Sequence, residues 1–159
     1  MKRLLLTGAS GFLGWNVCEF PQDDWEIIGL YNSHPDGIPD YINSYKVNLR
    51  EDYAFEQILE KTQADAVMHL AAISSPATCE EHPSDSYQLN VGVSRSIAQV
   101  CKDFALPLVF ASSEQVYNGQ QEINTEEDEV DPINKYGQQK LAAEQKILSI
   151  YPPACIARL

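Results

Sequence analysis

Near the N-terminus the sequence reads Leu4-Leu5-Leu6-Thr7-Gly8-Ala9-Ser10-Gly11-Phe12-Leu13-Gly14, where an apolar run meets three glycines spaced three residues apart. The apolar run is typical of a strand buried in a parallel sheet, and a helical pattern follows the glycines. We therefore predict that the chain opens with a strand, a tight turn and a helix, the first half of a βαβ unit.

Each of the three glycines meets a different steric demand of such a turn. Gly8 permits a tight turn out of the strand, Gly11 lets a pyrophosphate approach the backbone, and Gly14 lets the helix pack closely on the strand. The free N–H groups and the dipole of the helix start stabilise phosphate charge. We expect a dinucleotide to bind here through Gly8, Ser10, Gly11, Phe12, Leu13 and Gly14.

Short β-rich runs alternate with helical patterns along the rest of the chain. This order predicts an α/β fold, a doubly wound (Rossmann-type) parallel sheet with helices on both faces, formed by one domain over residues 1–159. The expected strands are Arg3–Thr7, Glu26–Tyr31, Tyr45–Val47, Ala66–Leu70, Leu106–Ala111 and Ala154–Leu159. The expected helices are Phe12–Phe20, Glu51–Lys61, Ser84–Phe104 and Asn134–Ile150.

The composition excludes several classes of protein. The chain has 11 Lys and Arg against 23 Asp and Glu, a net charge of −12, which repels phosphates, so neither nucleic acid nor an anionic membrane is expected as a partner. The four cysteines form no C-x-x-C pair, and we predict reduced thiols, a cytoplasmic protein and no metal site. The acidic run over residues 126–129 is interpreted as a solvated loop, because adjacent acids point in different directions.

The end of the second expected strand bears on the choice between NAD and NADP. Dinucleotide folds usually carry an acid here for the ribose hydroxyls of NAD, or an arginine for the 2′-phosphate of NADP. This chain has Tyr31, Asn32 and Ser33, followed by His34, and so offers neither group. Tyr31, Asn32 and Ser33 are expected to contact the cofactor, but the choice between the two forms stays open.

A tyrosine and a lysine lie four residues apart in the last expected helix. Tyr136 and Lys140 therefore share one helical face, where an ammonium is expected to lower the pKa of a phenol and so make it a better proton donor. Ser112 and Ser113 follow the fifth expected strand, at the edge of a parallel sheet where ligands bind. A hydroxyl there can hold a substrate carbonyl oxygen beside the phenol.

With these residues in place, the whole chain resembles the extended short-chain dehydrogenase/reductase family, in its branch of NAD(P)-dependent sugar-nucleotide epimerases, dehydratases and reductases. The matching motifs are Thr7 to Gly14, Asn48-Leu49, Leu70-Ala71-Ala72, Leu89-Asn90-Val91, Ser112 to Tyr117, and Tyr136 with Lys140. Asn48 stands where the family has an acid. The resemblance implies catalytic roles for Ser113, Tyr136 and Lys140, and contacts to NAD(P)(H) from Asn48, Leu49, Leu70, Ala71, Ala72, Ser112, Tyr136 and Lys140.

Within this branch the chain is most similar to the dTDP-4-dehydrorhamnose reductases and their relatives, which include a regulatory subunit of methionine adenosyltransferase. The family's dehydratases carry Asp-Glu after the catalytic hydroxyl, whereas this chain has Glu114-Gln115, and Gln115 cannot act as a base. The resemblance thus implies an oxidoreductase that reduces a keto group of a sugar nucleotide. Two alternatives stay open: an epimerase of sugar nucleotides, and a non-catalytic nucleotide-binding regulatory subunit.

In this family the substrate pocket is built largely by a C-terminal portion that follows the cofactor-binding domain. Residues 1–159 end with an apolar run that resembles a central strand, so we expect that portion to be absent from this sequence. Family members also often form homodimers through two helices of each subunit. The corresponding helices here, Ser84–Phe104 and Asn134–Ile150, are the candidates for such a homodimer interface, and the oligomeric state stays open.

Overall fold

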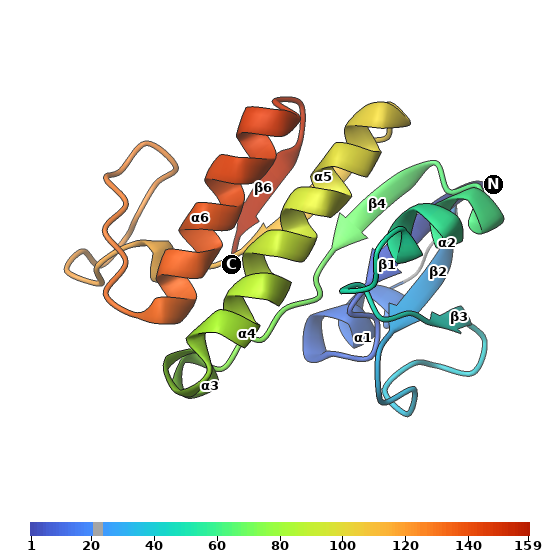
Figure 1. Ribbon diagram of the computed structural model, residues 1–159, viewed down its shortest axis with the longest axis horizontal. Coiled ribbons are helices and arrows are strands. Elements are labelled where there is room, and N and C mark those ends of the chain that lie inside the picture. The colour runs from blue at the N-terminus through green and yellow to red at the C-terminus, as the bar shows by residue number, and fades with distance from the viewer. Residues whose placement is uncertain (21–23) are drawn as a thin grey trace.

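A computed structural model describes residues 1–20 and 24–159. Within this part of the chain, six parallel strands form one sheet in the order β3-β2-β1-β4-β5-β6 (Figure 1). The strands are β1 (Lys2–Thr7), β2 (Trp25–Tyr31), β3 (Asn43–Lys46), β4 (Ala66–His69), β5 (Leu108–Ser112) and β6 (Cys155–Arg158). The order reverses between β1 and β4, so a crevice opens there at the carboxyl ends of the strands, where ligands bind in doubly wound sheets.

Helices cover both faces of the sheet. They are α1 (Phe12–Glu19), α2 (Ala54–Thr62), α3 (Pro76–Glu81), α4 (Pro83–Tyr87), α5 (Ser94–Asp103) and α6 (Lys135–Ile150). A π-helical turn, η1 (Gln88–Val93), joins α4 to α5, and a 3-10 turn, η2 (Glu114–Val116), follows β5.

Alternation along the strands divides the core into two clusters. Leu5 and Ile28 belong to the larger cluster, with buried residues of α2, α5 and α6. Their neighbours Leu6 and Ile27 point to the other face, where they pack with Cys18 of α1. Because successive strand residues face opposite sides, α1 covers one face and α2, α5 and α6 cover the other. The predicted doubly wound parallel sheet with helices on both faces is confirmed.

The boundaries of several elements differ from the predicted ones. The third strand is Asn43–Lys46 rather than Tyr45–Val47, and the fifth is Leu108–Ser112 rather than Leu106–Ala111. Pairing with β2 sets the limits of the third strand, and pairing with β4 and β6 sets those of the fifth. Hydrophobicity alone does not report such pairing. The helix α3 was not predicted, because its six residues lack apolar periodicity; its signal was Ser75, whose side chain accepts a hydrogen bond from the N–H of Thr78.

The long helix expected over residues 84–104 is interrupted at η1. Asn90, buried within this π-helical turn, accepts a hydrogen bond from the N–H of Ile73 at 2.8 Å and donates to its carbonyl at 3.0 Å. Asn90 also donates to the amide oxygen of Gln139 on α6 at 2.8 Å. A π-helical turn often marks a functional region, and this one ties the segment after β4 to α6.

Candidate active site

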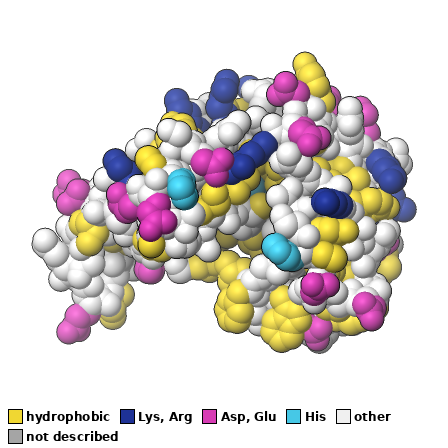
Figure 2. Space-filling model, turned by 60° about the horizontal axis from the view of Figure 1, so that its bottom comes forward, with side chains coloured by type: hydrophobic (Ala, Val, Ile, Leu, Met, Phe, Trp, Pro, Cys, Tyr) yellow, Lys and Arg dark blue, Asp and Glu magenta, His cyan; other side chains and the backbone are white. Residues whose placement is uncertain are grey.

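A cavity of about 690 Å³ lies at the carboxyl edge of the sheet, across the point where strand order reverses. Figure 2 brings this edge toward the viewer and shows a hollow with hydrophobic side chains on its walls. All residues predicted to contact a cofactor line this one cavity: Gly8, Ser10, Gly11, Phe12, Leu13, Gly14, Tyr31, Asn32, Ser33, Asn48, Leu49, Leu70, Ala71, Ala72, Ser112, Tyr136 and Lys140.

The glycine loop has the geometry that a phosphate group requires. Gly8 has a φ of +70°, and a Cβ there would lie 2.8 Å from the backbone nitrogen of Ala71. A Cβ on Gly14 would lie 2.2 Å from the carbonyl oxygen of Gly8, whereas one on Gly11 would meet only that same oxygen, at 3.4 Å. Gly11 caps α1 without a side-chain hydrogen bond. The N–H groups at the start of α1 therefore face a site that a pyrophosphate fits.

Beneath this loop, a chain of hydrogen bonds joins β1 and β4 to α5 and η1. Thr7 Oγ1 accepts from the N–H of Ala71 at 3.2 Å, so its own proton goes to His69 Nδ1, 2.7 Å away. His69 Nε2–H then donates to Ser94 Oγ at 2.9 Å, and Ser94 donates to the carbonyl of Asn90. Both ring nitrogens of the buried His69 therefore have hydrogen-bond partners, and its chain of bonds holds the backbone beside Ala71 in place.

Burial lowers the pKa of His69 to about 3, and the nearby Lys140 ammonium lowers it further in the same sense. The unfolded chain binds a proton at His69 below its ordinary pKa of about 6.5, while the folded protein does not. The contribution to stability is therefore complete above pH 6.5 and is lost as the pH falls toward 3, at about 1.4 kcal/mol per pH unit.

We expect His69→Gln to remove this part of the acid sensitivity. Urea unfolding at several pH values between 7.5 and 4.5 should show wild type and variant converging in free energy of unfolding as the pH falls. The exposed His34 provides the matched control, because His34→Gln should leave the wild-type pH dependence unchanged. If the free energies of unfolding of wild type and His69→Gln differed by the same amount at every pH, His69 would not be neutral in the folded protein.

The expected catalytic side chains come together at the carboxyl end of β5. The Ser113 hydroxyl lies within hydrogen-bonding reach of the Tyr136 phenol. Lys140 is 3% exposed, donates to the carbonyl oxygen of Ala111 at 2.7 Å, and lies over the Phe110 ring, 4.5 Å from its centroid. The phenol and the ammonium therefore line one end of the cavity, and the Ser113 hydroxyl lies beside the phenol.

One electrostatic prediction is wrong. We expected Lys140 to lower the pKa of Tyr136, but burial raises the pKa of Tyr136, and the hydrogen bond with Ser113 only partly offsets this rise. The reason is geometric: the Lys140 ammonium is 5.9 Å from the centre of the Tyr136 ring and is bound to a carbonyl. Burial also lowers the pKa of Lys140 to about 8, which the Glu144 carboxylate opposes.

The structure adds residues that sequence reasoning missed. The cavity is also lined by Leu30, Val47, Arg50, Ile73, Ser74, Asp85 and Ala111, and by His34 and Leu89, which the sequence patterns had already named. Arg50 forms an ion pair with Asp85 at 3.1 Å, which joins the loop after β3 to α4 across the mouth of the cavity. In the sequence, the only signal that Arg50 lines the cavity is its position directly after Asn48-Leu49. Ser113 faces Tyr136 but is not among the residues that line the cavity.

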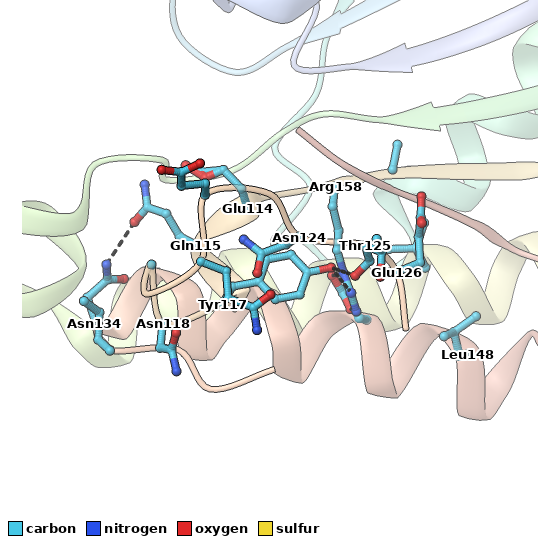
Figure 3. A pocket seen from close by; sticks show the side chains of 17 residues that line it. Glu114, Gln115, Tyr117, Asn118, Asn124, Thr125, Glu126, Asn134, Leu148 and Arg158 are labelled. Atoms are coloured by element: carbon cyan, nitrogen blue, oxygen red, sulfur yellow. Dashed lines mark hydrogen bonds and ion pairs between the residues drawn. The ribbon is translucent and has the colours of Figure 1, made fainter. Parts of the chain in front are cut away.

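A second hollow, of about 960 Å³, lies between the segment after β5 and the α6–β6 side of the molecule (Figure 3). Amide and carboxylate side chains make up much of its wall, among them Gln115, Asn118, Asn124 and Glu126. Among the described residues that line it, Arg158 is the single cation, and Glu144 pairs with it at 2.7 Å. The cation of this hollow is therefore already paired, and its lining does not include the glycine loop that offers N–H groups to a pyrophosphate.

Two negative findings apply to the described residues. No helix in residues 1–20 and 24–159 is both long and apolar enough to cross a bilayer. The same residues contain no group of three or more His, Cys, Asp or Glu side chains placed to hold a metal ion.

A comparison with family models decides the family. The model described as the RmlD substrate binding domain matches residues 1–159. The chain belongs to this family. We refer to it below as the RmlD-type chain. This match confirms the resemblance to the sugar-nucleotide branch of the extended short-chain dehydrogenases and reductases.

Three known proteins illustrate the relationship. Methionine adenosyltransferase 2 subunit beta from Rattus norvegicus is 33% identical over 161 residues, covering 99% of this chain and 46% of the relative. The probable low-salt glycan biosynthesis reductase Agl14 from Haloferax volcanii is 28% identical over 156 residues, 97% of this chain and 51% of the relative. The crystal structure of a hypothetical dTDP-4-dehydrorhamnose reductase from Sulfolobus tokodaii superposes with a TM-score of 0.86 at 29% identity, covering 98% of this chain and 55% of that one. The RmlD-type chain thus spans about half the length of these relatives.

Proposed function

We propose that this chain is the NAD(P)(H)-binding half of an oxidoreductase that reduces a keto group on a sugar nucleotide. The observation that carries the proposal is that Tyr136 and Lys140 line one end of the cavity, with Ser113 beside Tyr136, while the glycine loop lines the other end. A non-catalytic binding protein has no need of a proton donor beside its nucleotide. The similarity to reductases from Haloferax volcanii and Sulfolobus tokodaii supports the same choice.

The residues present fit a dinucleotide along the whole cavity. The start of α1 would hold the pyrophosphate, and Tyr31, Asn32 and Ser33 would lie along the adenosine ribose. Lys140 would bind the ribose next to the nicotinamide, at the Tyr136 end. When bound, the nicotinamide supplies or accepts a hydride. NAD and NADP are both compatible with these side chains, since the site offers hydroxyls and amides at the discriminating position.

The chain's own contribution to reduction is the movement of one proton. Tyr136 donates its phenolic proton to the carbonyl oxygen of the substrate while Ser113 donates a hydrogen bond to that same oxygen. Lys140 serves in this proposal to bind the cofactor ribose, because its ammonium is held by the carbonyl of Ala111 and lies 5.9 Å from the centre of the Tyr136 ring. Bound cofactor and substrate would exclude water from this end of the cavity, which strengthens the two hydrogen bonds to the substrate oxygen.

The substrate portion is proposed to lie outside these residues. The curated relatives are about twice as long as this chain, which covers 46% to 51% of them. We therefore expect residues 1–159 alone to bind the cofactor weakly and to turn over nothing. The nucleotide-sugar substrate, an assembly into homodimers and a cytoplasmic location belong to the same proposal.

The decisive experiment combines Tyr136→Phe with separate NADH and NADPH titrations. In the complete gene product, assayed with a dTDP-4-keto sugar, Tyr136→Phe should lower kcat by about 10²- to 10⁴-fold, because general acid catalysis is removed. Cofactor affinity should stay within about threefold of wild type, since no phosphate contact changes. Calorimetric titration and loss of absorbance from the reduced cofactor measure the two quantities.

Other outcomes select the alternatives. An epimerase would interconvert sugar nucleotides without net consumption of reduced cofactor. A regulatory subunit, which the similarity to methionine adenosyltransferase 2 subunit beta favours, would bind the nucleotide without turning over any sugar. If wild type bound neither NADH nor NADPH, the oxidoreductase proposal would be abandoned.

A further inference from the structure

A buried carboxylate outside the expected catalytic set lies one helical turn beyond Lys140. Glu144 is 3% exposed and accepts a hydrogen bond from Ser112 Oγ at 2.5 Å. Arg158 binds the same carboxylate with two nitrogen atoms, Nε to Oε1 at 3.0 Å and Nη2 to Oε2 at 2.7 Å. Two such parallel N–H···O bonds add geometric specificity to the ion pair.

The network continues to the loop that borders the second hollow. Arg158 Nη1 donates to the Tyr117 hydroxyl at 2.6 Å, and that hydroxyl donates to the carbonyl of Thr125 at 2.8 Å. Figure 3 shows Arg158 and Tyr117 pointing toward each other across this hollow, with Thr125 beside them. Glu144 is therefore held from two sides, and its orientation does not depend on solvent.

The network also reaches the candidate active site. Ser112 and Arg158 are register partners on the neighbouring strands β5 and β6, so both face the same stretch of α6. Ser112 lines the glycine-loop cavity, and the residue that follows it is Ser113. A displacement of Glu144 would thus move the end of β5 relative to the helix that carries Tyr136 and Lys140.

We propose that Glu144, clamped by Arg158, is a positioning residue that keeps Lys140 protonated and holds the end of β5 against α6. Its carboxylate sits at i+4 from Lys140 on the same helix, inside a buried region where charges are poorly screened. This inference rests on the proposed function, because the proposed function is what gives Lys140 a cofactor to bind.

Lys140 needs such a partner because its surroundings disfavour a positive charge. Burial lowers its pKa to about 8, and Glu144 provides the largest opposing influence. The titratable or charged groups around it are His69 on β4, Cys79 on α3, Tyr136 and Glu144 on α6, and, through Glu144, Arg158 on β6. Of these, His69 stays neutral above pH 4, since its own pKa is about 3.

The test measures Lys140 directly and without cofactor. The pH titration of the Lys140 side chain is followed by heteronuclear NMR of its ε-methylene group and assigned with Lys140→Met. Glu144→Gln keeps the size of the side chain and removes the charge, so the midpoint should move to lower pH by about one pH unit. Glu60→Gln, the same change on an exposed position of α2, should leave the midpoint unchanged.

For a second variant we expect the titration midpoint of Lys140 to shift in the opposite direction. This variant also provides a test if Glu144→Gln does not fold. Arg158→Gln removes the cation that offsets Glu144, so the midpoint for Lys140 should rise. A purely structural Glu144 would change the unfolding midpoint in these variants and leave the titration of Lys140 where it is. An unmoved Lys140 titration in either folded variant overturns the proposal.

Cofactor titrations separate this inference from the proposed function. NADPH and NADH are titrated by calorimetry between pH 6.5 and 9.5 with wild type, Glu144→Gln and Glu60→Gln. We expect Glu144→Gln to bind about fivefold more weakly than wild type at pH 8, with the difference closing toward pH 6.5. Binding of neither nucleotide by wild type contradicts the proposed function, whereas wild-type affinity of Glu144→Gln at every pH contradicts the role of Glu144 alone.

Discussion

Gly14→Ala is expected to destabilise the folded chain by about 3 kcal/mol or more, although it adds a single methyl group. The new Cβ would lie 2.2 Å from the carbonyl oxygen of Gly8 and 2.6 Å from the Cα of Ala9. Both are backbone atoms of the turn that leaves β1, so no side-chain rotation relieves the overlap. Helix α1 would have to move away from the sheet and expose Leu6 and its neighbours. Urea unfolding followed by circular dichroism measures the loss.

The matched control for this variant is Gly92→Ala. Gly92 lies in η1, and a Cβ added there meets nothing within 4 Å. Because alanine loses less conformational entropy than glycine in a helix, this variant should be neutral or more stable by up to about 1 kcal/mol. Equal losses in Gly14→Ala and Gly92→Ala would show that close packing of α1 on β1 is not what the third glycine provides.

Gly11→Trp is expected to weaken NADH and NADPH binding by at least about 100-fold while the chain stays folded. A Cβ on Gly11 meets only the Gly8 carbonyl, at an ordinary 3.4 Å, so the backbone accommodates a side chain. The indole would occupy the space in front of the start of α1. Two or more charge-assisted hydrogen bonds to phosphate would be lost, each contributing about 1.5–3 kcal/mol.

Calorimetry is the appropriate measurement, since an added tryptophan complicates fluorescence. Asn16→Trp is the control: Asn16 is exposed on the same helix, is outside the cavity lining, and receives the same side chain. It should bind both nucleotides as wild type does. Retained affinity in a folded Gly11→Trp would place the phosphates elsewhere and remove the basis for the proposed cofactor site.

Much of this molecule follows from local sequence patterns. The apolar run Leu4–Leu6 and the three glycines specify a strand, a turn and a helix, because their steric demands are met within fourteen residues. The alternation of strands and helices then leaves few topologies other than a parallel sheet. Every residue expected to contact the cofactor lies along one cavity, since the carboxyl ends of parallel strands converge on one edge.

The features decided by tertiary structure depend on distances between segments far apart in the chain. The pKa of Tyr136 is raised rather than lowered, because burial acts on it while Lys140 is held by the Ala111 carbonyl; helical spacing alone reports neither effect. The clamp of Ser112, Glu144 and Arg158 exists only because β5, α6 and β6 pack together. Sequence determines which groups share a helix or strand, whereas packing determines which of these groups are buried away from water. Burial shifts the pKa of a group by desolvation and also sets how strongly a neighbouring charge acts on it, so the packing decides the outcome.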